Sequence, residues 1–106
     1  MLDLVNWDFS KGFELCEQLE EKFEQACYQS IGRDASGYTE SDAIKTRKLC
    51  MLGKTNLQKS NCIVGAVKDF IAYFHTDREA KEFCESLQAE FKKDCLDVIN
   101  DFIKIF

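Results

Sequence analysis

The sequence predicts an all-α fold of three helical-hairpin repeats, each about 34 residues long, stacked like a short α-solenoid. The first observation is spacing, because the leading cysteines Cys16, Cys50 and Cys84 stand 34 residues apart. The second is a shared motif, Cys-x2-Leu-x3-Phe-x3-Cys, which spans both 16–27 and 84–95. The third is composition: proline is absent, there are only 5 glycines, and helix-forming residues recur throughout.

A degenerate copy of the motif supports the same period. It runs from Cys50 to Cys62 and has one additional residue between its cysteines. Gly53 stands in the leucine place and Leu57 in the phenylalanine place. Eight residues before each leading cysteine stands a residue type that commonly caps a helix N-terminus. These predicted caps are Asp8, Asp42 and Thr76.

The first unit is expected over residues 8–38. Leu19 and Phe23 lie on an apolar stripe with helical spacing, which predicts that both face the core. Gly32 lies in the closing segment of the unit. Gly37 is expected just after the end of the second helix, where glycine favours the left-handed conformation that stops a helix.

The second unit is expected over residues 39–75. Its first helix should run to about Leu52. The segment 53–56, Gly-Lys-Thr-Asn, is the clearest internal break, because glycine can end one helix and threonine or asparagine can cap the next. A longer helix is then expected from about Leu57 to Phe74.

The third unit is expected over residues 76–106. Thr76 and Glu79 have the spacing of a capping box and predict the start of its first helix. An apolar stripe continues to the end of the chain, where no following repeat covers it. It either folds back on the stack or forms a contact face for a partner or a second copy. Its residues are Val98, Ile99, Phe102, Ile103 and Phe106.

The cysteines fit two arrangements. In the first, each cysteine segment bends into a hairpin, and the disulfides are Cys16–Cys27, Cys50–Cys62 and Cys84–Cys95. In the second, 16–27 and 84–95 are continuous helices in a compact bundle, and their cysteines lie roughly 16 Å apart along each helix. The pairs are then Cys16–Cys95 and Cys27–Cys84. The break at 53–56 favours hairpins, whereas the lack of glycine inside the other two segments favours continuous helices.

Length and charge limit the functional classes. A chain of 106 residues is expected to form a single domain, residues 1–106. The net charge of −5 argues against nucleic-acid binding, which needs a basic surface. Acidic and basic residues are interspersed, which indicates a solvated helix surface, with an acidic face for a basic partner as the alternative. No membrane-spanning helix is expected.

Cysteine usage indicates an oxidising compartment. Six cysteines, an even number at regular spacing, are typical of a disulfide framework. We therefore expect a periplasmic or extracellular protein. The first residues lack the basic and apolar stretches of a signal peptide, so an exported protein would have lost its leader ahead of residue 1.

Candidate catalytic and metal-binding residues are scarce. The single histidine, His75, follows an apolar helical run and is expected near a helix C-terminus in an ordinary role. No cysteine pair has zinc-ligand spacing, and no cofactor is predicted. The residues therefore predict a protein that is not an enzyme. Copper(I) on inward-facing thiols is the alternative function if the cysteines are reduced.

The segment 16–32 carries cysteine, leucine, cysteine-tyrosine and glycine in the order Cys16, Leu19, Cys27-Tyr28 and Gly32. With the 34-residue period, this resembles cysteine-rich helical repeats of the Sel1-like and tetratricopeptide kind, in which a disulfide joins the two helices of each repeat. A weaker likeness is to paired Cys-x9-Cys proteins of the mitochondrial intermembrane space. The resemblance implies stacked helical hairpins and names no function.

The expected function is binding of a protein or peptide, in the groove lined by the first helix of each repeat. Stacked repeats present such grooves through their geometry. Tyrosine and arginine often anchor interfaces, and residue type alone selects the candidates. They are Tyr28, Arg33, Tyr38 and Tyr73.

Overall fold

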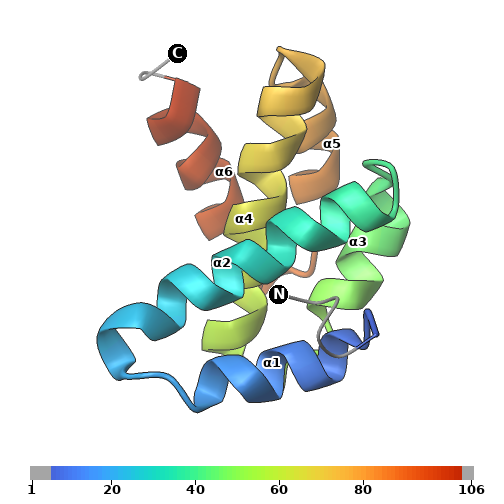
Figure 1. Cartoon of the computed structure of the whole chain (residues 1–106). Helices are drawn as coiled ribbons and strands as arrows, with labels where there is room; N and C mark the ends of the chain where they lie inside the picture. The colour runs from blue at the N-terminus through green and yellow to red at the C-terminus, as the bar shows by residue number, and fades with distance from the viewer. Residues whose placement is uncertain (1–5, 104–106) are drawn as a thin grey trace.

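The structure, a computed structural model, describes the backbone of residues 6–103 and the side chains of residues 6–102. This part of the chain contains six helices and no strand, which confirms the all-α class (Figure 1). The helices are α1 (Phe9–Glu17), α2 (Glu21–Tyr38), α3 (Ala43–Cys50), α4 (Asn56–Phe74), α5 (Arg78–Glu85) and α6 (Ala89–Ile103).

Two of the three predicted N-caps are confirmed. The carboxylate of Asp8 accepts a hydrogen bond from the backbone N–H of Lys11 at 3.2 Å, and Asp42 accepts one from Lys45 at 2.9 Å. Each bond satisfies a backbone donor that has no partner within the first turn of its helix. Thr55 caps α4 in the same way.

The third predicted cap, Thr76, is wrong by one residue. Asp77 precedes the first residue of α5 and makes no side-chain capping bond. The hydroxyl of Thr76 instead accepts a hydrogen bond from the N–H of Arg78, at 3.4 Å. A capping box therefore does not form at Thr76 and Glu79, because the helix begins too late in the sequence for that register.

The expectation that Gly37 follows the end of the second helix was wrong. It lies within the last turn of α2, which continues to Tyr38. The chain leaves the helix through Glu40 and Ser41, whose φ angles of 58° and 62° place both in the left-handed region. The N–H of Ser41 donates to the carbonyl of Ser36 at 2.7 Å, which holds this reversal without glycine.

Three disulfides cross the turns within successive helix pairs. They are Cys16–Cys27, Cys50–Cys62 and Cys84–Cys95, with Cα–Cα distances of 5.6, 5.4 and 5.6 Å. These are the pairs of the hairpin arrangement. Turns separate α1 from α2 and α5 from α6, so the continuous helices and the cross-pairs Cys16–Cys95 and Cys27–Cys84 were wrong.

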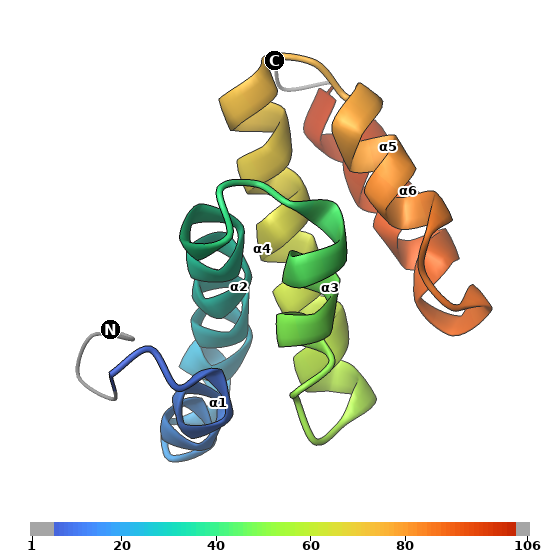
Figure 2. The ribbon, with the colours of Figure 1, turned by 90° about the vertical axis from the view of Figure 1, so that its right-hand side faces the viewer.

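The three helix pairs follow one another across the molecule (Figure 2). Helix α4 is central, since it packs against α2, α3, α5 and α6. Its contact with α2 is the most extensive between any two helices. The hydrophobic core follows this packing and includes Phe13, Tyr28, Ile31, Cys62, Ile63, Val67, Phe70, Phe83 and Ile99.

Two glycines bring α2 and α4 into backbone contact. A Cβ atom at Gly32 would lie 1.8 Å from the carbonyl oxygen of Cys62, and one at Gly65 would lie 1.8 Å from that of Gln29. Thirty-four residues later in the sequence stand Ala66 and Ile99, both fully buried. Neither position is glycine, and helices α4 and α6 diverge in Figure 1.

The glycine contact predicts opposite effects for two matched substitutions. Gly65→Ala places a methyl group against the backbone of α2 and should lower the free energy of unfolding by about 2 kcal/mol or more. Gly37→Ala is the control, because a Cβ there meets nothing within 4 Å, and it should raise that free energy by about 0.5–1 kcal/mol. Urea unfolding of the oxidised proteins measures both effects. A Gly65→Ala variant with an unchanged free energy of unfolding would contradict the backbone contact.

Candidate functional site

The four candidate interface residues have different environments. Arg33, Tyr38 and Tyr73 are exposed. Tyr28 is 0% exposed, so its expected place on an interaction surface was wrong. It lies on the same face of α2 as Ile31, one turn away, and that face packs against the core.

The three exposed candidates do not form one cluster. The ring of Tyr38 stacks on Trp7, with centroids 5.3 Å apart, and the ring of Tyr73 meets Phe74 edge-on at 4.9 Å. Arg33 lines a groove between α2 and α4. Within residues 6–102, no hydrogen bond, ion pair or ring contact joins one of the three to another.

The groove beside Arg33 has a volume of about 330 Å³. Small residues of both helices form part of its lining, and the charged residues Arg33, Lys68 and Asp69 also line it. Lys68 also lines a hollow of about 200 Å³ between α4 and α6, so the two are neighbours. The second hollow is more apolar, with Val64, Val98 and Phe102 in its lining.

A larger hollow, of about 530 Å³, lies at the α1–α2 turn. Leu19 and Leu57 supply its apolar lining, and Glu21, Lys22, Glu24 and Gln25 supply the polar part. Leu19 is 45% exposed and Leu57 49% exposed. Phe23, next to Lys22 in α2, is 54% exposed. The expectation that Leu19 and Phe23 face the core was therefore wrong.

The corresponding motif residues in the last helix pair are buried. Leu87 is 7% exposed and Phe91 is 3% exposed. They line a hollow of about 270 Å³ together with Arg47 of α3 and with Met51, which directly follows α3. The Arg47 guanidinium donates a hydrogen bond of 2.9 Å to the carbonyl of Ser86, so α3 covers this turn. This hollow is lined in part by α3, the first helix of its pair.

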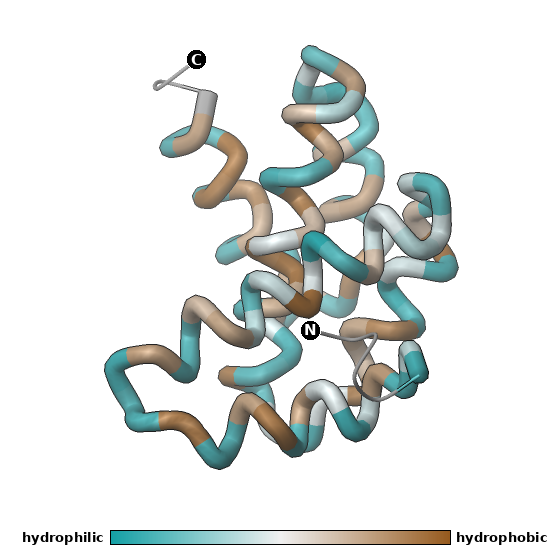
Figure 3. The backbone as a smooth tube through the Cα atoms, viewed as in Figure 1, coloured by the Kyte–Doolittle hydropathy of each residue, from teal (hydrophilic) through white to brown (hydrophobic). Residues whose placement is uncertain are grey.

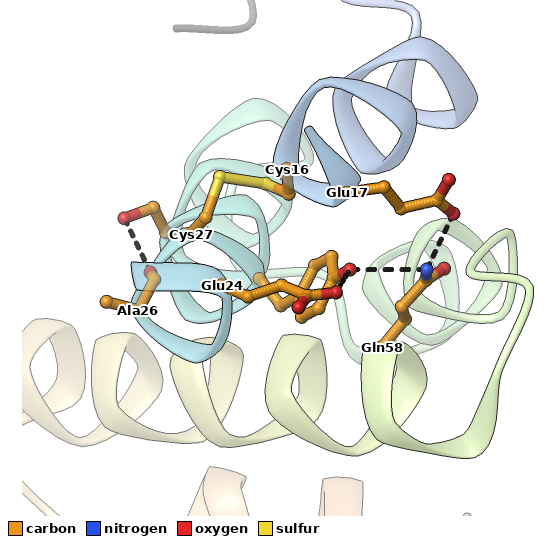
Figure 4. Close-up of a disulfide and its surroundings, with 8 residues drawn as sticks. Cys16, Glu17, Glu24, Ala26, Cys27 and Gln58 are labelled. Carbon is orange, nitrogen blue, oxygen red and sulfur yellow. Dashed lines mark hydrogen bonds between the residues drawn. A yellow bond between two sulfur atoms is a disulfide. The ribbon is translucent and has the colours of Figure 1, made fainter. Parts of the chain in front are cut away.

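A polar network surrounds the buried Tyr28 beside the first disulfide (Figure 4). The Tyr28 hydroxyl donates to the carboxylate of Glu24 and accepts from the Gln58 amide at 3.3 Å. The same amide nitrogen donates to Glu17 at 2.7 Å, and the Gln58 carbonyl accepts from the N–H of Lys54 at 2.7 Å. The network therefore joins α1, α2 and α4 through partners that satisfy one another.

This setting changes the acidity of the phenol. Burial and the hydrogen bond to Glu24 raise the pKa of Tyr28 from 10.0 to about 12. The hydrogen bond from Gln58 opposes this shift. A neutral phenol that serves as a donor in a core is a structural element, and Tyr28 has no exposed surface to offer a substrate.

The residues sought for metal binding or catalysis are not brought together. Within the described residues no group of three or more histidine, cysteine or acidic side chains could hold a metal ion. All six cysteines are in disulfides. His75 is exposed and follows α4 directly, as expected, and its φ of 58° makes it the left-handed residue that ends the helix.

None of the described helices is both long and apolar enough to cross a membrane. No protein-family model, curated protein or solved structure matches this chain. The likeness to Sel1-like and tetratricopeptide repeats is therefore carried by the quoted residues alone.

Sequence reasoning missed the Tyr28 network. Glu24 and Tyr28 are four residues apart on one helix, a spacing that allows their side chains to meet. Gln58 and Glu17 come from other helices, and only the packing of α4 brings them there. The exposure of Leu19 and Leu57 was equally hidden, since periodicity identifies an apolar face and not what covers it.

The network predicts a change in alkaline stability. As the pH rises from about 10 to 12, unfolded Tyr28 loses its proton before folded Tyr28, so the free energy of unfolding falls in this range. Tyr28→Phe should remove that part of the fall and should cost about 1 kcal/mol at neutral pH, because Glu24 and Gln58 lose a partner. Urea unfolding at several pH values measures both effects.

Tyr73→Phe is the matched control, because its ring is exposed and none of the network bonds involves it. Its alkaline profile should follow that of the parent protein. Identical profiles for Tyr28→Phe and the parent would contradict the role assigned to the buried hydroxyl.

Proposed function

We propose that this chain is a non-enzymatic module that binds a protein or peptide. The observation that carries the proposal is the combination of exposed apolar side chains with open hollows on a disulfide-braced helical frame. Leucine and phenylalanine at the α1–α2 turn offer the kind of surface that buries an apolar side chain of a partner. Enclosed pockets for small molecules are of a different shape, apolar and largely closed.

We further propose that the three helix pairs are repeats of one unit within a single domain, over approximately 8–38, 39–75 and 76–106. The turn hydrogen bonds support this. The N–H groups of Gln18 and Leu19 donate to the carbonyls of residues 15 and 16. The same pattern recurs 34 residues later at Leu52 and Gly53, and again at Ser86 and Leu87. Together with the disulfides, this favours a short stack of hairpins over an irregular bundle.

The disulfides also support an oxidising compartment, periplasmic or extracellular. Such bonds persist outside the reducing cytosol and brace domains whose core is small. The alternative function, binding of copper(I) through thiolates, requires that disulfides be reduced to thiols. A loss of six hydrogens by mass spectrometry of the purified chain supports the module, whereas six alkylatable thiols with bound metal support the alternative.

Self-association through the C-terminal apolar stripe stays a second proposal for the partner. Val98 and Phe102 are half-buried beside Val64, so part of the stripe folds back on α4. The side chain of Ile103 and the whole of Phe106 lie outside the described residues.

A peptide selection tests the proposed function. A displayed random-peptide library is panned against the immobilised oxidised chain, with the reduced and alkylated chain for counter-selection. We expect enriched sequences that share a motif and bind with micromolar dissociation constants, and we expect reduction to weaken binding at least about tenfold, because the turns lose their bridges. A library that yields no peptide above background would contradict the proposal.

A further inference from the structure

The turns of the first and third helix pairs have the same local geometry. Both disulfides span a Cα–Cα distance of 5.6 Å. In each turn, the N–H of the motif leucine donates to the carbonyl of the leading cysteine, at 3.1 Å for both Leu19 and Leu87. The motif phenylalanines, Phe23 and Phe91, stand four residues later in both. The two turns therefore offer the same face in the same local conformation.

In the third pair, helix α3 covers this face. Arg47 and Met51 stand one turn apart on α3 and at its end, and they line the hollow with Leu87 and Phe91. The guanidinium of Arg47 reaches across to the carbonyl of Ser86. An apolar residue and a cation at i, i+4 spacing thus bury the turn, and the cation takes a backbone carbonyl as its partner.

The second turn is covered from the equivalent position. Gly53 takes the place of Leu87, and a Cβ atom there would lie 3.3 Å from Cε1 of Phe13 on α1. Phe13 stands three residues before its leading cysteine, as Arg47 does. The same helix position therefore packs on the turn of the following pair in both cases. In both cases the residue three positions before the leading cysteine of one pair lies at the turn of the next pair.

The first turn has no such cover among the described residues, and Leu19 and Phe23 are about half exposed. The residues around it are acidic. Five glutamates and one lysine lie between positions 14 and 24, and Glu14 pairs with Lys54 at 3.7 Å. Glu21, Lys22 and Glu24 line the hollow itself, and Lys22 is engaged with Glu20 at 3.6 Å and with the ring of Phe23. The surroundings favour a cation at the place that Arg47 occupies in the third pair.

Helix α5 of a second copy fits this face poorly. Lys81 and Glu85 of α5 correspond to Arg47 and Met51, 34 residues earlier in the sequence. Lys81 already pairs with Asp77 at 2.8 Å, and Glu85 pairs with Lys92 at 2.7 Å. Docking α5 on the first turn would bring a glutamate toward glutamates and would offer no apolar residue. A different protein is the better occupant.

We infer that the Leu19–Phe23 face binds an amphipathic helical segment of another protein, with a basic residue and an apolar residue one turn apart. The apolar residue packs on Leu19 and Phe23. The cation reaches the carbonyl of Gln18, which corresponds to Ser86 of the third pair, and the glutamates around the turn. This inference rests on the proposed peptide-binding function and names the site and the chemistry of the partner.

The probe is a synthetic peptide with the sequence of residues 42–52, Cys50→Ser, and an alanine-rich helical tail. It is titrated into the oxidised, 15N-labelled full chain and followed by NMR. We expect saturable shifts centred on the amides of Leu19 and Phe23, weakened by added salt because the contact is partly ionic. A peptide in which the residue corresponding to Arg47 is replaced by glutamate should bind at least about tenfold more weakly.

Phe23→Ser should weaken binding of the first peptide about tenfold, since it removes apolar surface at an exposed position. Ile44→Ser is the matched control, an exposed apolar residue at the start of α3, and it should leave binding unchanged. Shifts centred elsewhere, or equal loss with both variants, would overturn the inference. If selected library peptides bind while this peptide does not, the inference fails and the proposed function stands; if no peptide binds, both fail.

Discussion

The backbone contact between α2 and α4 is the constraint on which the rest of the arrangement depends. Gly32 and Gly65 allow the two helices to approach until the carbonyls of one fill the place of a Cβ on the other. A hydrogen bond of 3.0 Å between Gln29 and Asn61 lies beside the crossing. This approach brings Gln58 to Tyr28 and closes the polar network. Because α4 also packs against α3, α5 and α6, its position determines where these helices lie.

The disulfides act at a different level from this contact. Each closes a short loop within one helix pair, and none joins one pair to another. By limiting the unfolded chain, a loop of this length contributes about 2–3 kcal/mol. The disulfides therefore hold the turns, whereas helix packing determines how the pairs lie against each other. Figure 3 shows hydrophobic residues alternating with hydrophilic ones along these helices. The turn that carries Leu19 is closed by the Cys16–Cys27 disulfide.

Sequence reasoning reached the helix pairs, two of the N-caps and the all-α class, since spacing and capping are local properties. It failed where the outcome depends on a neighbouring helix. Gly32 was interpreted as part of a closing segment, although its lack of a side chain allows α4 to approach α2 closely. Tyr28 was selected by residue type and is buried, while Leu19 was assigned to the core and is exposed. Periodicity identifies an apolar face and does not show whether another helix covers it.

The covers of the second and third turns differ in chemistry. Gly53 lies close to the aromatic ring of Phe13, whereas Leu87 lines a hollow with Arg47, whose guanidinium donates a hydrogen bond to the carbonyl of Ser86. Leu19 matches Leu87 in size and not Gly53. An arginine or lysine of a partner would extend along this leucine and bring its charge to the glutamates. The leucine at the turn and the acidic residues beside it therefore favour the same kind of partner residue.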